Sequence, residues 1–240
     1  MNAEVDQLNP TMDGTLYLEV SARLSMDPTE LMEKYTGRLL WFAEGGDYVV
    51  GQTRWWVIRV NEMIDRRLSP CLMLDGEDAD TAAFCELFLE DDWEWPKAIR
   101  QVCPEPMFGD LAILDRLIVN PPFRGKKVGL HCMEMTMRIT GGMGLFALYP
   151  MPLQHHPQYA KEVAMKKTTK RADLRKLIAY YEQAGFRQVP GSKFMVLDPR
   201  MLNPAIEWED SGGDVTFERT TAMEQYRLKS NVEDERDGNW

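Results

Sequence analysis

The sequence predicts an α/β fold of the α+β kind, and three observations support that prediction. A β-rich apolar run at 111–119, a long apolar helix after it and a buried-type strand at 145–149 form a βαβ unit, whose strands should be parallel with a right-handed crossover. Residues 38–43 and 48–60 are β-rich arms around Gly45-Gly46, which predicts a hairpin. The chain has 240 residues, 44% of them hydrophobic, so it can bury a sizeable core.

The first elements in chain order are two strands with a helix between them. Alternating polar and apolar residues at Thr15–Val20 predict a strand. Asp27 as a cap and Pro28 at the first helical position predict a helix that runs to about Lys34–Tyr35. The first hairpin arm, Arg38–Ala43, also fits an extension of that helix, so both interpretations stay open.

The second half of the chain alternates helices and strands. Helical patterns at 61–67 and 80–89 precede the βαβ unit, whose own helix ends at Gly141-Gly142. The remaining predicted elements are a polar, basic and mobile loop at 151–170, a helix at Ala172–Ala184 with Gly185 as its C′ residue, and short strands at Phe186–Val189 and Phe194–Leu197.

These elements predict one domain with two extensions. Residues 1–14 are polar and expected to be flexible, and 15–205 are expected to form a single domain. The composition turns acidic and polar at 206–240, which predicts a solvated C-terminal tail, with a helical pattern around Ala222–Leu228.

Composition excludes several classes of function. A net charge of −10 argues against general nucleic-acid binding, which needs a basic surface. No apolar run approaches the ~20 residues of a membrane span, so no membrane partner is expected. The four cysteines lack CxxC spacing and there are only three histidines, so no metal site is expected. The N-terminus lacks the pattern of a signal peptide, and a cytoplasmic location is the simplest expectation.

The turn after the strand at 111–119 has features of an anion site. Asn120-Pro121-Pro122 stops the strand because proline cannot donate to a sheet ladder. The segment Arg124–Gly129 then carries glycines and basic residues into the start of a helix. Free backbone N–H groups and the helix dipole both favour a phosphate at such a position.

Two separated motifs together resemble one known family. Arg124-Gly125-Lys126-Lys127-Val128-Gly129, with its lead-in Leu117–Phe123, resembles the R/Q-x-x-G-x-G/A turn of the GNAT superfamily of acetyl-CoA-dependent N-acetyltransferases. Tyr181-Glu182-Gln183-Ala184-Gly185-Phe186 resembles that family's later Y-E-x-x-G-F helix end. The resemblance covers about residues 111–198. It implies a mixed, mostly antiparallel sheet with a splayed central parallel pair and helices on both faces.

The resemblance also implies acetyl-CoA as co-substrate and a set of residues that hold it. The turn would anchor the pyrophosphate, and the splayed strand would hold the pantetheine arm through its main chain. One position departs from the family, because Lys127 stands where the motif has its first glycine. The lysine can donate its N–H if it holds helical dihedrals, and its charge, with those of Arg124 and Lys126, would attract phosphates. The implied binding residues are Leu117, Ile118, Val119, Arg124, Gly125, Lys126, Lys127, Val128 and Gly129.

The resemblance implies a less complete set of catalytic residues than of binding residues. Tyr181 matches the family tyrosine that protonates the departing thiolate. The strand position where many members carry a glutamate is Ile113 here, and Asp115, two residues on, shares its face and is the best candidate for the base. Other bases stay open: a water-mediated Glu86 or Glu94, or the histidine pair His155-His156.

The expected activity is acetyl transfer from acetyl-CoA to a primary amine on a small molecule or peptide. The acidic run 75–94, with nine acidic and no basic side chains, would suit a cationic acceptor if it faces the cleft. Three alternatives remain: a transferase of another acyl group, an acyl-homoserine-lactone synthase, or a catalytically degenerate protein that binds coenzyme A for regulation. The oligomeric state is open, a homodimer included.

Overall fold

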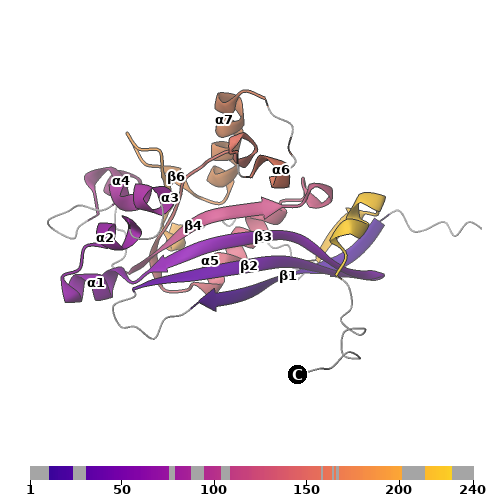
Figure 1. Cartoon of the computed structure of the whole chain (residues 1–240), viewed down its shortest axis with the longest axis horizontal. Helices are drawn as coiled ribbons and strands as arrows, with labels where there is room; N and C mark the ends of the chain where they lie inside the picture. Colours follow the sequence, from indigo (N-terminus) through magenta and orange to yellow (C-terminus); the bar gives the residue numbers. More distant parts are fainter. Residues whose placement is uncertain are drawn as a thin grey trace, which may run out of the picture.

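A mostly antiparallel sheet organises the chain in a computed structural model of the 240 residues (Figure 1). The structure describes residues 11–23, 31–75, 79–87, 95–103, 109–157, 159–163, 165, 168–201 and 214–228. The eight described strands lie in the order β6-β7-β5-β4-β3-β2-β1-β8. Among them β4 and β5 are parallel, and every other neighbouring pair is antiparallel.

Helices connect or cover the strands in a fixed order. The strands are β1 (Thr11–Arg23), β2 (Met32–Ala43), β3 (Gly46–Ile58), β4 (Asp110–Val119), β5 (Met143–Leu148), β6 (Arg187–Gln188), β7 (Met195–Leu197) and β8 (Asp214–Glu218). The α-helices are α1 (Val60–Arg66), α2 (Pro70–Asp75), α3 (Ala79–Ala82), α4 (Lys97–Val102), α5 (Val128–Ile139), α6 (Ala160–Val163) and α7 (Lys170–Gln183). Short 3₁₀ turns are η1 (Ala83–Leu87), η2 (Pro121–Phe123), η3 (Leu153–His155), η4 (Pro199–Met201) and η5 (Thr221–Tyr226).

The predicted hairpin and βαβ unit are confirmed. β2 and β3 pair in antiparallel register from Met32↔Ile58 to Ala43↔Gly46, and β4 and β5 flank α5 as a parallel pair. The predicted helix through Lys34–Tyr35 is wrong where the structure describes it, because β2 begins at Met32; Asp27 and Pro28 lie outside the described residues. Stacking of Tyr35 on Trp55 and of the Lys34 ammonium on Trp56 favours the strand over the local helical signal.

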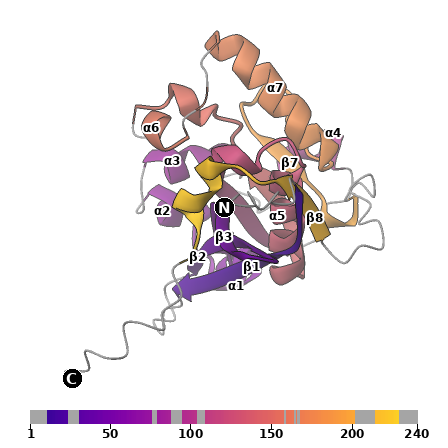
Figure 2. The same cartoon turned by 90° about the vertical axis from the view of Figure 1, so that its right-hand side faces the viewer.

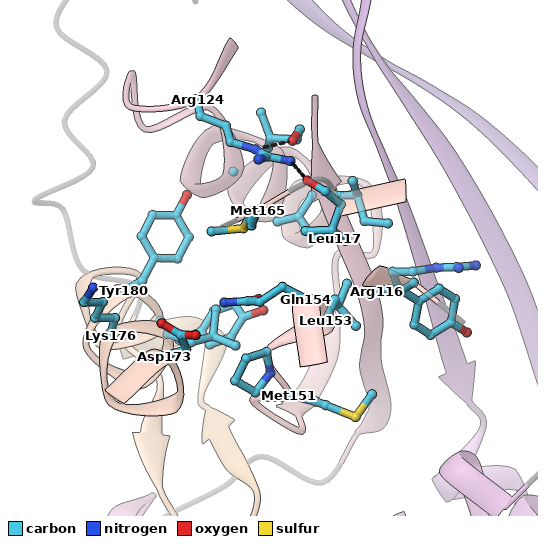
Figure 3. Close-up of a pocket in the computed structure, with 18 of the residues that line it drawn as sticks. Arg116, Leu117, Arg124, Met151, Leu153, Gln154, Met165, Asp173, Lys176 and Tyr180 are labelled. Atoms are coloured by element: carbon cyan, nitrogen blue, oxygen red, sulfur yellow. Dashed lines mark hydrogen bonds between the residues drawn. The ribbon is translucent and has the colours of Figure 1, made fainter. Parts of the chain in front are cut away.

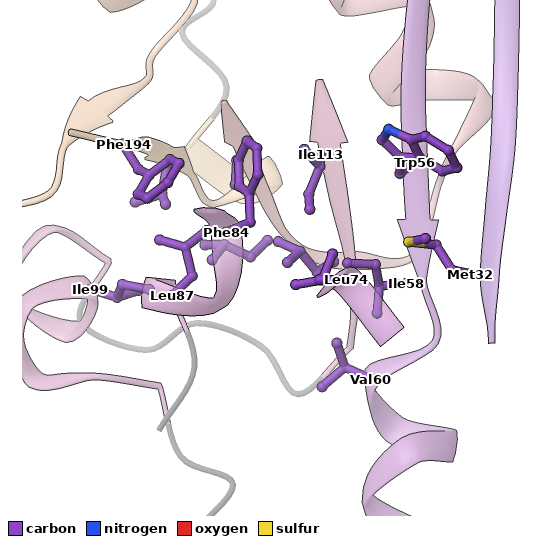
Figure 4. Packing of buried hydrophobic residues seen from close by; sticks show 14 of the residues in the cluster. Met32, Trp56, Ile58, Val60, Leu74, Phe84, Leu87, Ile99, Ile113 and Phe194 are labelled. Atoms are coloured by element: carbon purple, nitrogen blue, oxygen red, sulfur yellow. The ribbon is translucent and has the colours of Figure 1, made fainter. Parts of the chain in front are cut away.

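The two faces of the central strands bury different side chains because successive residues alternate between faces. Trp56, Ile58 and Ile113 pack on one face under the helical segment of α1–α4, with Leu74, Leu87 and Ile99 among the contacts (Figure 4). Trp55, Ala112 and Phe146 pack on the other face with residues of α5 and α7. Figure 2 shows α2 and α3 on one side of the sheet and α5 on the other.

Part of the predicted acidic tail belongs to the sheet. β8 pairs with β1 from Thr11↔Glu218 to Thr15↔Asp214, and the side chains of Phe217 and Met223 are buried. The indole N–H of Trp41 donates to the carbonyl oxygen of Val215 at 3.1 Å. Val215, Phe217, Met223 and Tyr226 therefore belong to a packed cluster around Trp41 and Phe123, while most other side chains of 215–228 are exposed. The expectation of a solvated tail is wrong for the strand that pairs with β1.

Candidate functional site

The parallel pair at the centre of the sheet separates after its first half. β4 and β5 are paired from Asp110↔Met143 to Leu114↔Leu148, and β5 then ends. β4 continues to Val119, and among the described strands it is paired with β3 alone along that length. A cavity of about 720 Å³ opens beside the unpaired half of β4, within the ~300–1,000 Å³ range of small-molecule sites. The site therefore lies where the sheet gives β4 a free edge.

Most of the cavity wall comes from four parts of the chain. Its lining residues include residues 114–119 of β4, the turn before α5, the loop after β5 and one face of α7 (Figure 3). Both strand residues and turn residues predicted from the sequence are thus brought together. Among the predicted cofactor residues, the lining contains Leu117, Ile118, Val119, Arg124, Gly125, Lys127, Val128 and Gly129. Lys126 is exposed and is not among the lining residues.

A β-bulge shapes the strand side of the cavity. In the register of β3 with β4, Trp55 faces Leu114 and Arg54 faces Arg116, so Asp115 is the extra residue. A bulge bends its strand and redirects side chains, and bulges are common beside active sites. Adjacent strand residues normally point to opposite faces, yet both Asp115 and Arg116 line the cavity here.

Asp115, the predicted base, lies in the cavity wall beside a cation. The guanidinium Nε of Arg54 donates to its carboxylate Oδ2 at 2.5 Å, and both side chains are largely buried. Ion pairing compensates the charge of an acid that would be costly to bury alone. The salt bridge is with a residue of β3, a partner that the sequence pattern did not identify.

The turn before α5 leaves several backbone amides without a carbonyl partner. Gly125 has φ +86° and Lys127 has φ +57°, while Lys126 between them does not have a positive φ. Within the described residues, the amides of 125–128 make no backbone hydrogen bond. Such an alternation of backbone conformation directs consecutive N–H groups into one concavity that favours an anion. Lys127 does not hold helical dihedrals, because it has the left-handed conformation that the glycine of the motif adopts readily.

Arg124 stabilises the turn instead of pointing at a ligand. Its Nε donates to the carbonyl oxygen of Val119 at 2.7 Å, and its terminal nitrogen donates to that of Val163 at 2.5 Å (Figure 3). Burial lowers the pKa of the guanidinium from its ordinary value. The side chain therefore joins the end of β4 to α6. These contacts do not support the predicted role of Arg124 in attracting phosphate.

Tyr180, which sequence reasoning missed, reaches the start of α5. Its hydroxyl oxygen lies against the first turn of α5, where a Cβ at Gly129 would be 2.5 Å from it. Burial raises the pKa of Tyr180 to about 12, although the nearby backbone of Leu130 and Gly129 lowers the pKa of that hydroxyl. The N–H of Leu130 itself donates to the carbonyl oxygen of Lys127 at 2.8 Å. Gly129 thus allows close approach of an oxygen to the helix N-terminus, and in this structure the oxygen belongs to Tyr180.

Tyr181, the predicted acid, also lines the cavity. Its ring packs edge-on against those of Tyr180 and Phe186, with centroids 6.0 and 6.1 Å away. Burial, followed by the neighbouring Tyr180, raises the pKa of its hydroxyl well above the ordinary value. A higher pKa holds the proton more tightly, so proton donation from Tyr181 is harder than from an exposed phenol.

The loop after β5 is more structured than its composition predicts. Nε2 of His155 lies 2.7 Å from a carboxylate oxygen of Asp173, and the hydroxyl of Thr168 donates to the other oxygen at 2.5 Å. Hydrogen bonds from Thr168 and then from His155 lower the pKa of Asp173. The ring of His156 stacks on Tyr159. The two histidines fasten the loop to α7 and to itself, and neither lines the cavity, which argues against them as the base.

The acidic run contributes little to the site where it is described. Glu86 pairs with Lys193 at 3.3 Å, and Asp75 is exposed. Phe84 is the residue of this run that reaches the cavity lining among those the structure describes. Glu94 lies outside the described residues.

Comparisons of the chain with protein-family models, with curated proteins and with solved structures found no match. Within the described residues, no helix is both long and apolar enough to cross a membrane. The features of the chain that point to a function are the geometry of the cavity and the two sequence motifs at its walls.

Proposed function

We propose that this chain is a GNAT-type N-acetyltransferase, which transfers the acetyl group of acetyl-CoA to a primary amine. One observation carries the proposal: the cavity lies between the free edge of β4 and the amide-rich turn at the start of α5. The turn residues and Tyr181 belong to the two motifs that resemble the family, and all but Lys126 of the turn line this one cavity.

The binding residues fit the co-substrate at both ends. The amides of 125–128, with the helix dipole of α5 and the ammonium of Lys127, supply an electropositive site for a pyrophosphate. The free edge of β4 offers backbone N–H and C=O groups to the amides of a pantetheine arm, as an exposed strand edge does for a peptide. An N–H at this edge can also polarise the thioester carbonyl.

The chemistry is a direct acyl transfer. The amine nitrogen attacks the carbonyl carbon, the carbon–sulfur bond breaks, the nitrogen loses a proton and the thiolate gains one. Asp115 is the candidate that accepts the amine proton, because it is an acid in the cavity wall. Tyr181 is the candidate donor to the thiolate, and Tyr180 is a second phenol in the same wall.

Isothermal titration calorimetry with acetyl-CoA tests this proposal. We expect the wild-type chain to bind, and Lys127→Glu to weaken binding by about tenfold or more, because a carboxylate beside the pyrophosphate repels it. Arg219→Glu makes the same charge change at an exposed position outside the cavity and should leave the affinity unchanged. No binding at high micromolar acetyl-CoA would refute the proposal.

A second candidate function is coenzyme A binding without catalysis. Two observations favour it: the Tyr180 hydroxyl already occupies the space beside Gly129 at the start of α5, and the charge of Asp115 is compensated by Arg54. A chain that binds acetyl-CoA but releases no free thiol with any amine offered would support this second function. Turnover with a longer acyl-CoA alone would instead indicate another acyltransferase.

A further inference from the structure

A second, smaller cavity lies on the sheet and shares one residue with the first. It has a volume of about 220 Å³ and is lined by polar residues of β1, β2, β3 and β4. Arg116 lines both cavities, so its side chain stands at their junction. The lining residues of the smaller cavity are Glu19, Ser21, Thr36, Gly37, Arg38, Gln52, Thr53, Arg54 and Arg116.

The charged residues around this junction are not equivalent. Arg38 is paired with Glu19 at 2.6 Å, and Arg54 is paired with Asp115 at 2.5 Å. The guanidinium of Arg116 instead lies 4.6 Å from the ring centroid of Tyr159, and it forms no ion pair with any residue that the structure describes. The ring fixes the guanidinium plane through a cation–π contact and leaves its N–H groups for another partner.

We propose that Arg116 binds a carboxylate of the acceptor, so that the acceptor is an amine carrying an anionic group, such as an amino acid or an acidic peptide. This inference rests on the proposed acetyl transfer. A guanidinium can donate two parallel hydrogen bonds to a carboxylate, which fixes orientation as well as charge. Asp115 and Arg116 line the same larger cavity, so an acceptor held by Arg116 can place its amine in the cavity that contains the candidate base.

The charge of the walls supports an anionic acceptor over the cationic one that the acidic run suggested. Three arginines and one glutamate line the smaller cavity, and no residue of 75–94 that the structure describes lines it. When Asp115 is included, three arginines face two acids at the junction, which leaves one positive charge uncompensated. A lysine-rich peptide or polyamine would meet repulsion there.

Binding of two product-like probes to the chain saturated with coenzyme A tests this inference. The probes are acetyl-Gly-Asp-Asp-Gly-amide and acetyl-Gly-Lys-Lys-Gly-amide, which share a backbone and carry charges of opposite sign. We expect the acidic probe to bind at least about tenfold more tightly, and Arg116→Gln to remove that preference. Arg116→Lys should keep only part of it, because an ammonium keeps the charge but loses the paired hydrogen bonds. Arg219→Gln, at an exposed position outside both cavities, should keep all of it.

The outcomes separate this inference from the proposed function. If wild-type chain binds acetyl-CoA but shows no preference for the acidic probe, or binds neither probe at millimolar concentration, the anionic acceptor is wrong and the transferase proposal stands. A preference that survives in a folded Arg116→Gln chain would refute the role of Arg116. If acetyl-CoA itself does not bind, the proposed function and this inference fall together.

Discussion

The two halves of β4 differ in what they pair with, although they belong to one continuous strand. Residues 111–114 lie between β3 and β5, and Leu111 and Ile113 are completely buried. Residues 115–119 keep β3 but lose β5, and they include the charged pair Asp115-Arg116. The paired half contributes to stability, whereas the unpaired half presents a free backbone edge and two charges to a cavity.

Local sequence explains why the strands separate at this point. Pro150 and Pro152 follow β5, and proline cannot donate to a sheet ladder, so β5 cannot continue beside β4. The bulge at Asp115 bends β4 at the same level. The end of β5 and the bulge in β4 thus leave the second half of β4 as an edge that borders the cavity.

Truncation of one apolar side chain in each half of β4 should give the largest difference in the free energy of unfolding. Ile113→Ala removes a completely buried side chain and should lower the free energy of unfolding by about 2–5 kcal/mol. Leu117→Ala, at a partly buried cavity position, should cost clearly less because the site already borders open space. Urea denaturation of both variants measures the difference, and equal losses would contradict the division of β4 into two parts.

Asp115→Asn tests the charged residue of the unpaired half. If Asp115 is the base, the variant should lose about 10²–10⁴-fold in kcat, the range of general base catalysis. Acetyl-CoA affinity, measured by calorimetry, should change little because the amide keeps the size of the carboxyl group. Retention of kcat within a few-fold would show that another group accepts the proton.

Tyr180→Phe tests whether the phenol competes with a phosphate for the amides of α5. Without the hydroxyl, the space beside the Gly129 N–H opens, and acetyl-CoA should bind about fivefold more tightly, which corresponds to a net hydrogen bond of ~1 kcal/mol. The Leu130 N–H keeps its bond to the Lys127 carbonyl oxygen in both chains. Tyr181→Phe is the matched control, since its ring lines the same cavity and its hydroxyl has no such amide contacts. Unchanged or weaker binding by Tyr180→Phe would argue against competition.

Lys127→Gly should have the smallest effect on stability. The left-handed conformation costs an L-residue ~1–2 kcal/mol, and glycine relieves this cost while losing ~0.5–1 kcal/mol of chain entropy. The net gain in the free energy of unfolding should be about 0.5–1 kcal/mol. Lys127→Ala removes the same charge without relieving the backbone and should give no gain; a gain of equal size for both would assign the effect to charge.

The parts of the fold that local signals determine were predictable from the sequence. The strand at 110–119, the helix after it and its glycine-bearing turn follow from periodicity, proline and glycine, and each is where it was expected. The helix expected through Lys34–Tyr35 is a strand because Trp55 and Trp56, about 20 residues away, supply the packing. Long-range pairing of this kind overrides a helical signal that is purely local.

The candidate site was likewise only partly predictable from the sequence. Sequence motifs located the turn and Tyr181, but they could not show that Arg54 pairs with Asp115 or that Arg124 contacts Val119 and Val163. These contacts join residues brought together by the sheet register and by the packing of α6, which no local pattern encodes. Tyr180 carried one weak signal, since it precedes the motif tyrosine directly.

Hydrogen exchange along β4 and the following turn tests the central claim most directly. Backbone amides on the free edge of 115–119 and those of 125–128 should exchange quickly in the free chain, and acetyl-CoA should slow them. Amides of 111–114, already held between two strands, should exchange slowly with or without the ligand. Protection confined to other segments, or no change at 115–128 under saturating acetyl-CoA, would contradict the assignment of this edge as the binding site.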